Sequence, residues 1–109
     1  MPRYLSLFSF KGETLGKLVQ NPSDREAAVR ELATSLGGNL EAYYLMFGPH
    51  DGCAIFEMPD TISAAAAAIT VVSSGAFASF QTHELVTSDE FLEALDKAKA
   101  VTSYRAPGT

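Results

Sequence analysis

Side chains that could take part in chemistry are concentrated in the segment FGPHDGCAIFEMPD, residues 47–60. His50 and Asp51 are adjacent, and a histidine beside a carboxylate can act as a general base near neutral pH. Adjacent residues of a strand point to opposite faces, so the two side chains are not expected to form a dyad. For Asp51 we favour a structural role, in which it binds backbone amides in the turn after Pro49. We therefore name His50 and Asp51 as candidate catalytic residues, with a structural role as the alternative for each.

The strand that follows Asp51 carries two more reactive side chains on one face. By the two-residue period of a strand, Cys53 and Glu57 share the face of Asp51, so the three could line a polar pocket. The alternative for Cys53 is a small buried apolar residue. A metal or haem site would require His50 and His83, which lies on a later strand, to converge on this face. No cofactor is predicted, because one strand supplies only part of a coordination shell.

Aromatic side chains are the third group with a candidate role. Tyr43 and Tyr44 lie on one expected strand and Phe56 on the next. A ligand pocket between a sheet and its helices usually combines such apolar walls with a few polar groups, and a tyrosine hydroxyl is a suitable proton donor. The alternative is that these rings only pack in the core. The candidate ligand-binding residues are Tyr43, Tyr44, Phe56, Cys53, Glu57 and His83.

The composition is that of one globular domain, residues 1–109. The apolar fraction is 47%, the charged fraction 19% and the formal net charge −5. The 8 basic residues are spread along the chain, so neither nucleic acid nor a membrane surface is an expected partner. Cys53 is the single cysteine, and the N-terminal residues lack the pattern of a signal peptide. We therefore expect a cytoplasmic protein.

Hydrophobic periodicity and turn residues predict alternating strands and helices. Strands are expected at residues 3–10, 39–47, 51–58 and 77–86. A short helix is expected over 14–19, and longer helices after Ser23, over 61–74 and over 88–102, before a flexible tail at 103–109. This β-α-β-β-α-β order with a C-terminal helix predicts an α+β, ferredoxin-like fold with a four-stranded antiparallel sheet.

Residues that begin and end helices support these boundaries. Ser23 and Thr87 each stand three residues before a glutamate, the pattern of a capping box. Asp60 is expected to cap the helix that follows it. Gly37 and Gly75 are expected to end helices, because glycine accepts the left-handed backbone conformation found there.

The distribution of apolar residues predicts self-association. Apolar side chains occupy both faces of the strand at 3–10 and nearly every face of the helix at 61–74. One layer of helices covers only one face of a sheet, and soluble monomers rarely expose a large apolar patch. We therefore expect a homo-oligomer with a dimer as its basic unit.

The segments YLSLFSF, NPSDREAAVRELATSLGG and YYLMFGPHDGCAIFEMPD resemble the GYD-domain family, small bacterial and archaeal proteins of the dimeric α/β-barrel group. The family's namesake element corresponds to residues 48–51, followed by Glu57, Met58, Pro59 and Asp60. His50 stands where the family usually has tyrosine. The resemblance covers almost the whole chain and implies a dimeric α/β barrel. Wider relatives with that fold include cofactor-free monooxygenases, lactone isomerases and haem-binding enzymes.

Two classes of function follow from the residues and the resemblance. The first is binding of a small organic ligand between sheet and helices, with or without a proton transfer, isomerisation or cofactor-free oxidation. The second is a non-catalytic oligomeric scaffold or regulatory binding module. A metal- or haem-binding protein using His50 and His83 is a further alternative. We favour ligand binding, because polar residues in apolar strands cost stability unless they have partners.

Overall fold

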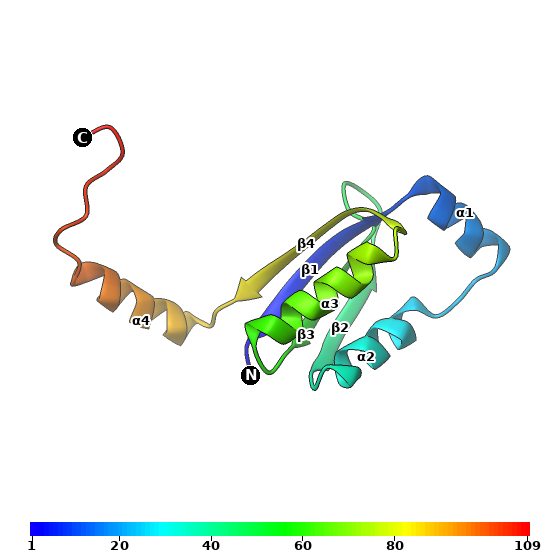
Figure 1. Ribbon diagram of the computed structural model, residues 1–109, viewed down its shortest axis with the longest axis horizontal. Coiled ribbons are helices and arrows are strands. Elements are labelled where there is room, and N and C mark those ends of the chain that lie inside the picture. Colours follow the sequence, from blue (N-terminus) through cyan, green and yellow to red (C-terminus); the bar gives the residue numbers. More distant parts are fainter.

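The computed structural model describes residues 1–109 as an α+β domain with four strands and four helices (Figure 1). In chain order the elements are β1 (Arg3–Phe10), α1 (Gly12–Gln20), α2 (Arg25–Ser35), β2 (Asn39–Leu45), β3 (Gly52–Glu57), α3 (Thr61–Ser73), β4 (Phe77–Leu85) and α4 (Ser88–Lys99). The predicted elements are all present, with ends that differ by a few residues. None of the four helices is long and apolar enough to cross a lipid bilayer.

The sheet has the strand order β2-β3-β1-β4, and every neighbouring pair is antiparallel. The first and third strands are therefore central and the second and fourth lie at the edges. Helices α2 and α3 cover one face of the sheet, α2 packing mainly on β2 and α3 mainly on β4 (Figure 1). This arrangement is ferredoxin-like and confirms the predicted fold class.

The covered face of the sheet carries the core. On β1, Tyr4, Ser6, Phe8 and Phe10 are buried beneath the helices, and the alternate residues point to the other face. The strands β3 and β4 continue the same alternation, because directly paired residues share a face. In the single chain only one face of β1 is covered, whereas the sequence predicted cover on both. We call the uncovered side the open face.

Within the single chain helix α3 is likewise covered on one side, and the sequence predicts a second subunit over part of the rest. Its sequence led us to expect burial on more than one side. Ala64 and Ala67 are buried, but Ile62, Ile69 and Val72 expose 78%, 66% and 54% of their surface. The small alanines let the helix lie close to the sheet, while its larger apolar residues face away from the core of the same chain.

Helix ends follow local chemistry, with one correction. The residue that caps α2 is Asp24 and not Ser23, because the Asp24 carboxylate accepts a hydrogen bond from the Ala27 amide at 3.1 Å. Thr87 forms the predicted capping box, and Asp60 accepts from the Ser63 amide at 2.8 Å. Glycines with positive φ follow α2 and α3, as predicted.

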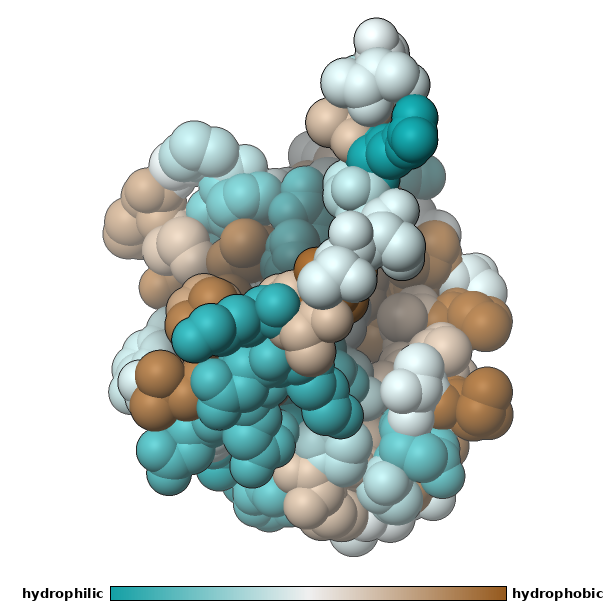
Figure 2. Space-filling model, turned by 90° about the vertical axis from the view of Figure 1, so that its left-hand side faces the viewer, coloured by the Kyte–Doolittle hydropathy of each residue, from teal (hydrophilic) through white to brown (hydrophobic).

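Helix α4 extends away from the rest of the domain (Figure 1). The radius of gyration is 17.5 Å, against about 13 Å for a compact chain of this length. Phe91, Leu92 and Leu95 of α4 are 55%, 58% and 48% exposed. Figure 2 views the molecule from this end, where apolar side chains appear beside charged ones. The residues that follow α4 are exposed and form no further helix or strand.

Candidate functional site

A cavity of about 300 Å³ lies between the covered face of the sheet and helices α2 and α3. Its walls are mostly apolar and come from β1, α2, β2, β3, α3 and β4. Four of the lining residues on the helices are alanines, whose short side chains fill little of the space. The lining residues are Ser6, Phe8, Phe10, Arg25, Ala28, Val29, Leu32, Ala33, Tyr43, Phe56, Met58, Ala67, Ala68, Thr70, Val71, Ser74, Phe77, Phe80 and Thr82.

Aromatic rings form the wall of the cavity on the side of the sheet. The Phe8 ring lies 5.6 Å from Phe10, 5.9 Å from Tyr43 and 5.7 Å from Phe77, measured between ring centroids. Phe77 also contacts Phe80 at 6.1 Å, which extends the wall to the edge strand. These distances are typical of favourable aromatic pairs. The wall is therefore suited to contact with a flat apolar molecule.

Gly52 allows the Phe8 ring to take its position. Gly52 is the partner of Phe8 across the β1–β3 ladder. A Cβ atom on Gly52 would lie 2.4 Å from Cζ of Phe8, so any larger residue would displace the ring. The glycine in the segment GPHDG thus has a packing role at the back of the aromatic wall.

Two hydroxyl groups lie on the sheet side of the cavity. Ser6 and Thr82 are paired across β1 and β4, and their hydroxyl oxygens are 2.9 Å apart. Ser6 is only 2% exposed. The pair has two hydroxyl hydrogens and one mutual hydrogen bond, so one hydrogen remains for a molecule in the cavity.

A register shift in β2 decides which tyrosine faces the cavity. The pairing of β2 with β3 shifts between Leu40 and Ala42, where β2 contains an extra residue. Leu40 and Tyr43 therefore share the covered face, and Tyr44 points to the open face. Burial raises the pKa of the half-buried Tyr43 phenol, and nearby Arg25 partly offsets that rise. Tyr43 is accordingly a protonated hydrogen-bond donor at neutral pH.

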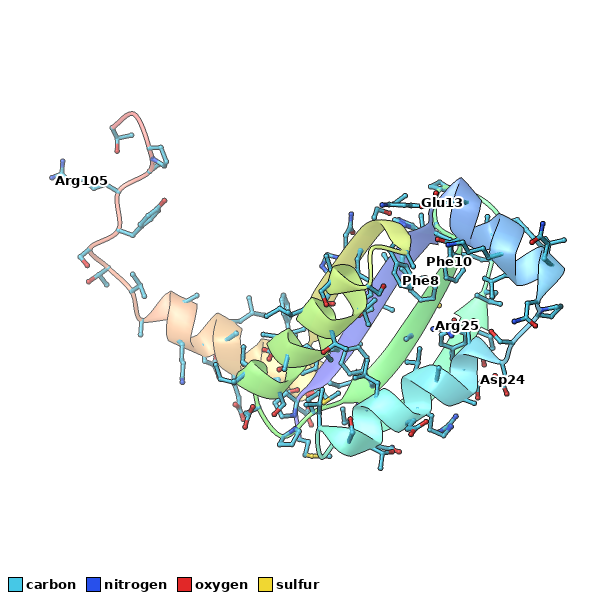
Figure 3. All side chains as sticks on the ribbon, turned by 45° about the vertical axis from the view of Figure 1, so that its right-hand side comes forward. Phe8, Phe10, Glu13, Asp24, Arg25 and Arg105 are labelled. Carbon is cyan, nitrogen blue, oxygen red and sulfur yellow. The ribbon has the colours of Figure 1, made fainter.

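Arg25 is the only permanently charged residue of the lining. It is the first residue of α2, and Figure 3 places it between the start of that helix and the Phe8–Phe10 end of β1. The carboxylate on each side of Arg25 in the sequence already has a partner. Asp24 caps α2, and Glu26 pairs with Arg30 at 2.9 Å. The Arg25 side chain forms no hydrogen bond or ion pair within the chain.

The candidate residues from the sequence fall into three separate groups. Tyr43 and Phe56 line the cavity. His50 and Asp51 lie in the connection between β2 and β3, and neither lines the cavity. The remaining candidates lie on the open face, as their pairing with residues of β1 and β3 shows; they are Tyr44, Cys53, Glu57 and His83.

Asp51 joins the end of β1 to the start of β3. Its carboxylate accepts a hydrogen bond from the Phe10 amide at 2.9 Å, at the point where the β1–β4 register shifts. Its own backbone amide donates to the Phe8 carbonyl at 2.8 Å, and its carbonyl accepts from the Met46 amide. Beside it, His50 has a buried Nδ1 atom with no hydrogen-bond partner. The carboxylate of Asp51 thus supplies a partner for the Phe10 amide beyond the end of the β1–β3 pairing, whose last pair is Phe8 and Gly52.

The open-face candidates do not form one cluster. Cys53 lies in a row with Leu7, whereas His83 lies opposite Leu5 with its Nε2 atom 3.3 Å from the side-chain oxygen of Gln81. Glu57 lies at one end of the face, 3.9 Å from Arg3. No group of three or more histidine, cysteine, aspartate or glutamate side chains is placed to hold a metal ion. His50 and His83 therefore do not converge on a shared site.

Five polar residues of the lining were not found from the sequence: Ser6, Arg25, Thr70, Ser74 and Thr82. Thr70 and Ser74 donate their hydroxyl hydrogens to carbonyls of Ala66 and Val71 in α3. Ser6 and Thr82 look like ordinary polar residues of two strands until the β1–β4 register pairs them. Arg25 did carry a local signal, because the dipole of a helix disfavours a cation in its first turn. A residue placed against that preference can have a role outside the helix.

The fold and the cavity define a small ferredoxin-like α+β domain with one covered face, one open face and an apolar pocket beneath its helices. The family model described as GYD domain matches residues 4–95 of the 109-residue chain. The chain belongs to the GYD domain family. A comparison with curated proteins gave no match.

Proposed function

We propose that this protein binds a small organic ligand in the cavity between its sheet and helices α2 and α3. The observation that carries the proposal is an apolar space of about 300 Å³ with a few polar groups directed at it. Ligand pockets usually combine apolar walls with a small number of polar groups that orient the ligand. Here those groups are Arg25, Tyr43 and the Ser6–Thr82 pair.

The size of the space supports a role beyond packing. Protein interiors are close-packed, and voids much larger than a water molecule are few. A cavity of about 300 Å³ falls at the lower end of the range for ligand pockets, about 300–1,000 Å³. The compact volume and aromatic wall favour a small aromatic molecule.

The composition of the lining favours ligand binding over catalysis that needs several acid and base groups. Arg25 and Tyr43 are its only titratable residues, so the lining contains no carboxylate, imidazole or thiol. If the protein catalyses a proton transfer, an isomerisation or a cofactor-free oxidation in the cavity, Tyr43 is the proton donor. A scaffold without a ligand is the competing function, and it would have no use for an open cavity.

The same proposal includes assembly with a second copy of the chain through the open face. Leu5, Leu7 and Ile55 form the apolar centre of that face, and the chain's own helices leave it uncovered. Helix α4 also lacks a surface within its own chain, and isolated helices of 12 residues are marginal in water. A second copy of the chain would supply an apolar surface for the open face and for helix α4.

The test uses N-phenyl-1-naphthylamine, a neutral probe that fluoresces when it enters an apolar site. The variant Ala67→Phe places a ring into the cavity, since Ala67 is a buried lining residue on α3. The control Ala65→Phe makes the same change on the exposed side of the same helix. We expect the wild type and Ala65→Phe to bind the probe and Ala67→Phe to lose at least tenfold in affinity.

Two results would contradict the proposal. If no variant binds the probe, the cavity does not accept apolar molecules. If Ala67→Phe binds as well as the control, the probe is bound elsewhere, such as on the open face. Circular dichroism of each variant checks that the helices are intact. Filling an existing cavity should leave the thermal stability of Ala67→Phe unchanged or raised, in contrast to the cost of overfilling a close-packed core.

A further inference from the structure

The mouth of the cavity has an unusual charge for this protein. A second groove adjoins the cavity and shares Phe10, Arg25, Ser74 and Phe77 with it. Apart from Ala76, its other lining residues come from α1 and the residue that follows it, and they include Lys17 but no carboxylate. The chain as a whole has a net charge of −5. Two cations and no anion therefore line this groove, while on the side of β2 the same Arg25 borders Asp24 and Glu26, both of which already have partners.

Arg25 is placed at this mouth at a cost to its own helix. The N-terminal end of a helix carries a partial positive charge, so a cation in the first turn is disfavoured. Glu26 does not relieve that cost, because adjacent side chains of a helix do not face each other and Glu26 pairs with Arg30. Asp24 uses its carboxylate on the Ala27 amide and lies on the outer side of the helix in Figure 3. The Arg25 guanidinium thus keeps all its donors free beside the cavity.

We infer that the ligand is an aromatic carboxylate, with its ring against Phe8, Phe10 and Phe77 and its carboxylate bound by Arg25. This inference rests on the proposed function and names the chemical class of its ligand. A planar guanidinium binds a carboxylate through two parallel hydrogen bonds, which fixes the orientation of the bound molecule. The Tyr43 hydroxyl and the free hydrogen of the Ser6–Thr82 pair bind acceptor atoms on the ring.

Local and long-range electrostatics act in opposite directions here, which makes the inference testable. The net charge of −5 repels any anion that approaches from solvent. A preference for an anionic ligand over a neutral one of the same shape must therefore come from groups near the cavity. Arg25 is half-buried, so its attraction for a carboxylate is less screened than that of an exposed residue.

The experiment compares 2-naphthoate with 2-naphthalenemethanol, which has the same ring system and a neutral hydroxyl. Binding of each is measured by isothermal titration calorimetry at low salt and neutral pH. The variant Arg25→Gln removes the charge at the mouth, and Arg105→Gln removes the same charge in the distant C-terminal tail (Figure 3). We expect the wild type and Arg105→Gln to bind 2-naphthoate about tenfold more tightly than the alcohol. In Arg25→Gln the two ligands should bind within about twofold of each other.

The possible outcomes separate this inference from the proposed function. If both compounds bind equally well to the wild type, the cavity binds apolar rings and the assignment of a carboxylate is overturned. If Arg25→Gln keeps the preference for 2-naphthoate, another group binds the carboxylate, and the role of Arg25 is overturned. If neither compound binds at millimolar concentration, the proposed function itself fails, and this inference fails with it.

Discussion

Replacing Asp51 with alanine tests whether the residue beside His50 stabilises the fold. The Asp51 carboxylate accepts a hydrogen bond of 2.9 Å from the Phe10 amide, where the register between β1 and β4 shifts. The substitution leaves that amide without a partner. The two backbone hydrogen bonds of Asp51, to Phe8 and from Met46, do not involve the side chain and should persist.

The size of the effect follows from the chemistry of this hydrogen bond. A bond to a charged group contributes about 1.5–3 kcal/mol. The Phe10–Asp51 bond is only partly buried, so water can reach the freed amide and the lower end of this range applies. We expect Asp51→Ala to lower the free energy of unfolding by about 1.5 kcal/mol, or Tm by roughly 6–12 °C. Asp51→Asn keeps an acceptor oxygen and should lose about half as much.

The assay is urea unfolding followed by circular dichroism, with all variants at the same protein concentration because self-association would make stability depend on it. Glu84→Ala is the control, since Glu84 is an exposed carboxylate without a hydrogen bond or ion pair. Its effect should stay within about 0.5 kcal/mol. If Asp51→Ala also lowers the free energy of unfolding by less than about 0.5 kcal/mol, the structural role is refuted. Asp51 would then again be a candidate catalytic residue.

Two further predictions concern assembly and acid stability. Sedimentation of the wild type should show an even-numbered oligomer, and a monomeric wild type would contradict the proposed assembly. Leu7→Glu on the open face should lower the affinity of self-association about tenfold or more. Val19→Glu on the exposed side of α1 should leave that affinity unchanged. Backbone amides lower the pKa of two carboxyls by hydrogen bonding, Ser63 that of Asp60 and Thr87 that of Glu90. A carboxyl whose pKa is lowered in the folded state stabilises the fold at pH values above its ordinary pKa, about 4. That stabilisation is lost as the pH falls below this value. The Tm of the wild type should therefore fall more between pH 6 and pH 3 than the Tm of the double variant Asp60→Asn/Glu90→Gln. An equal fall in both proteins would contradict the role of these carboxylates at the helix ends.

The reactive side chains of residues 47–60 do not reach the cavity, although Phe56 and Met58 of the same stretch line it. His50, Asp51, Cys53 and Glu57 are close in the chain, but the strand alternation and the turn send them to the open face and to the β2–β3 connection. Sequence proximity on a strand does not bring side chains together, because neighbours point to opposite faces. Among the candidates, Tyr43 and Phe56 are the two that reach the cavity.

The elements of the fold were predictable because their signals are local. Alternating apolar residues, glycines after helices and caps such as Asp60 and Thr87 act within a few residues of the chain. The capping residue of α2 was misplaced by one position, since Ser23 and Asp24 both carry a suitable oxygen. Only the geometry of the chain entering the helix decides between them.

The sequence by itself determined the order of strands and helices, the ferredoxin-like topology and the family, because each depends on local periodicity or on a pattern of consecutive residues. The tertiary structure alone decided the site. One extra residue in β2 turns Tyr43 toward the cavity and Tyr44 away from it. The β1–β4 register joins Ser6 to Thr82, and the packing of α2 places Arg25 beside Phe10 at the mouth. These contacts join segments that are far apart in the chain, and a pattern within one segment does not contain them.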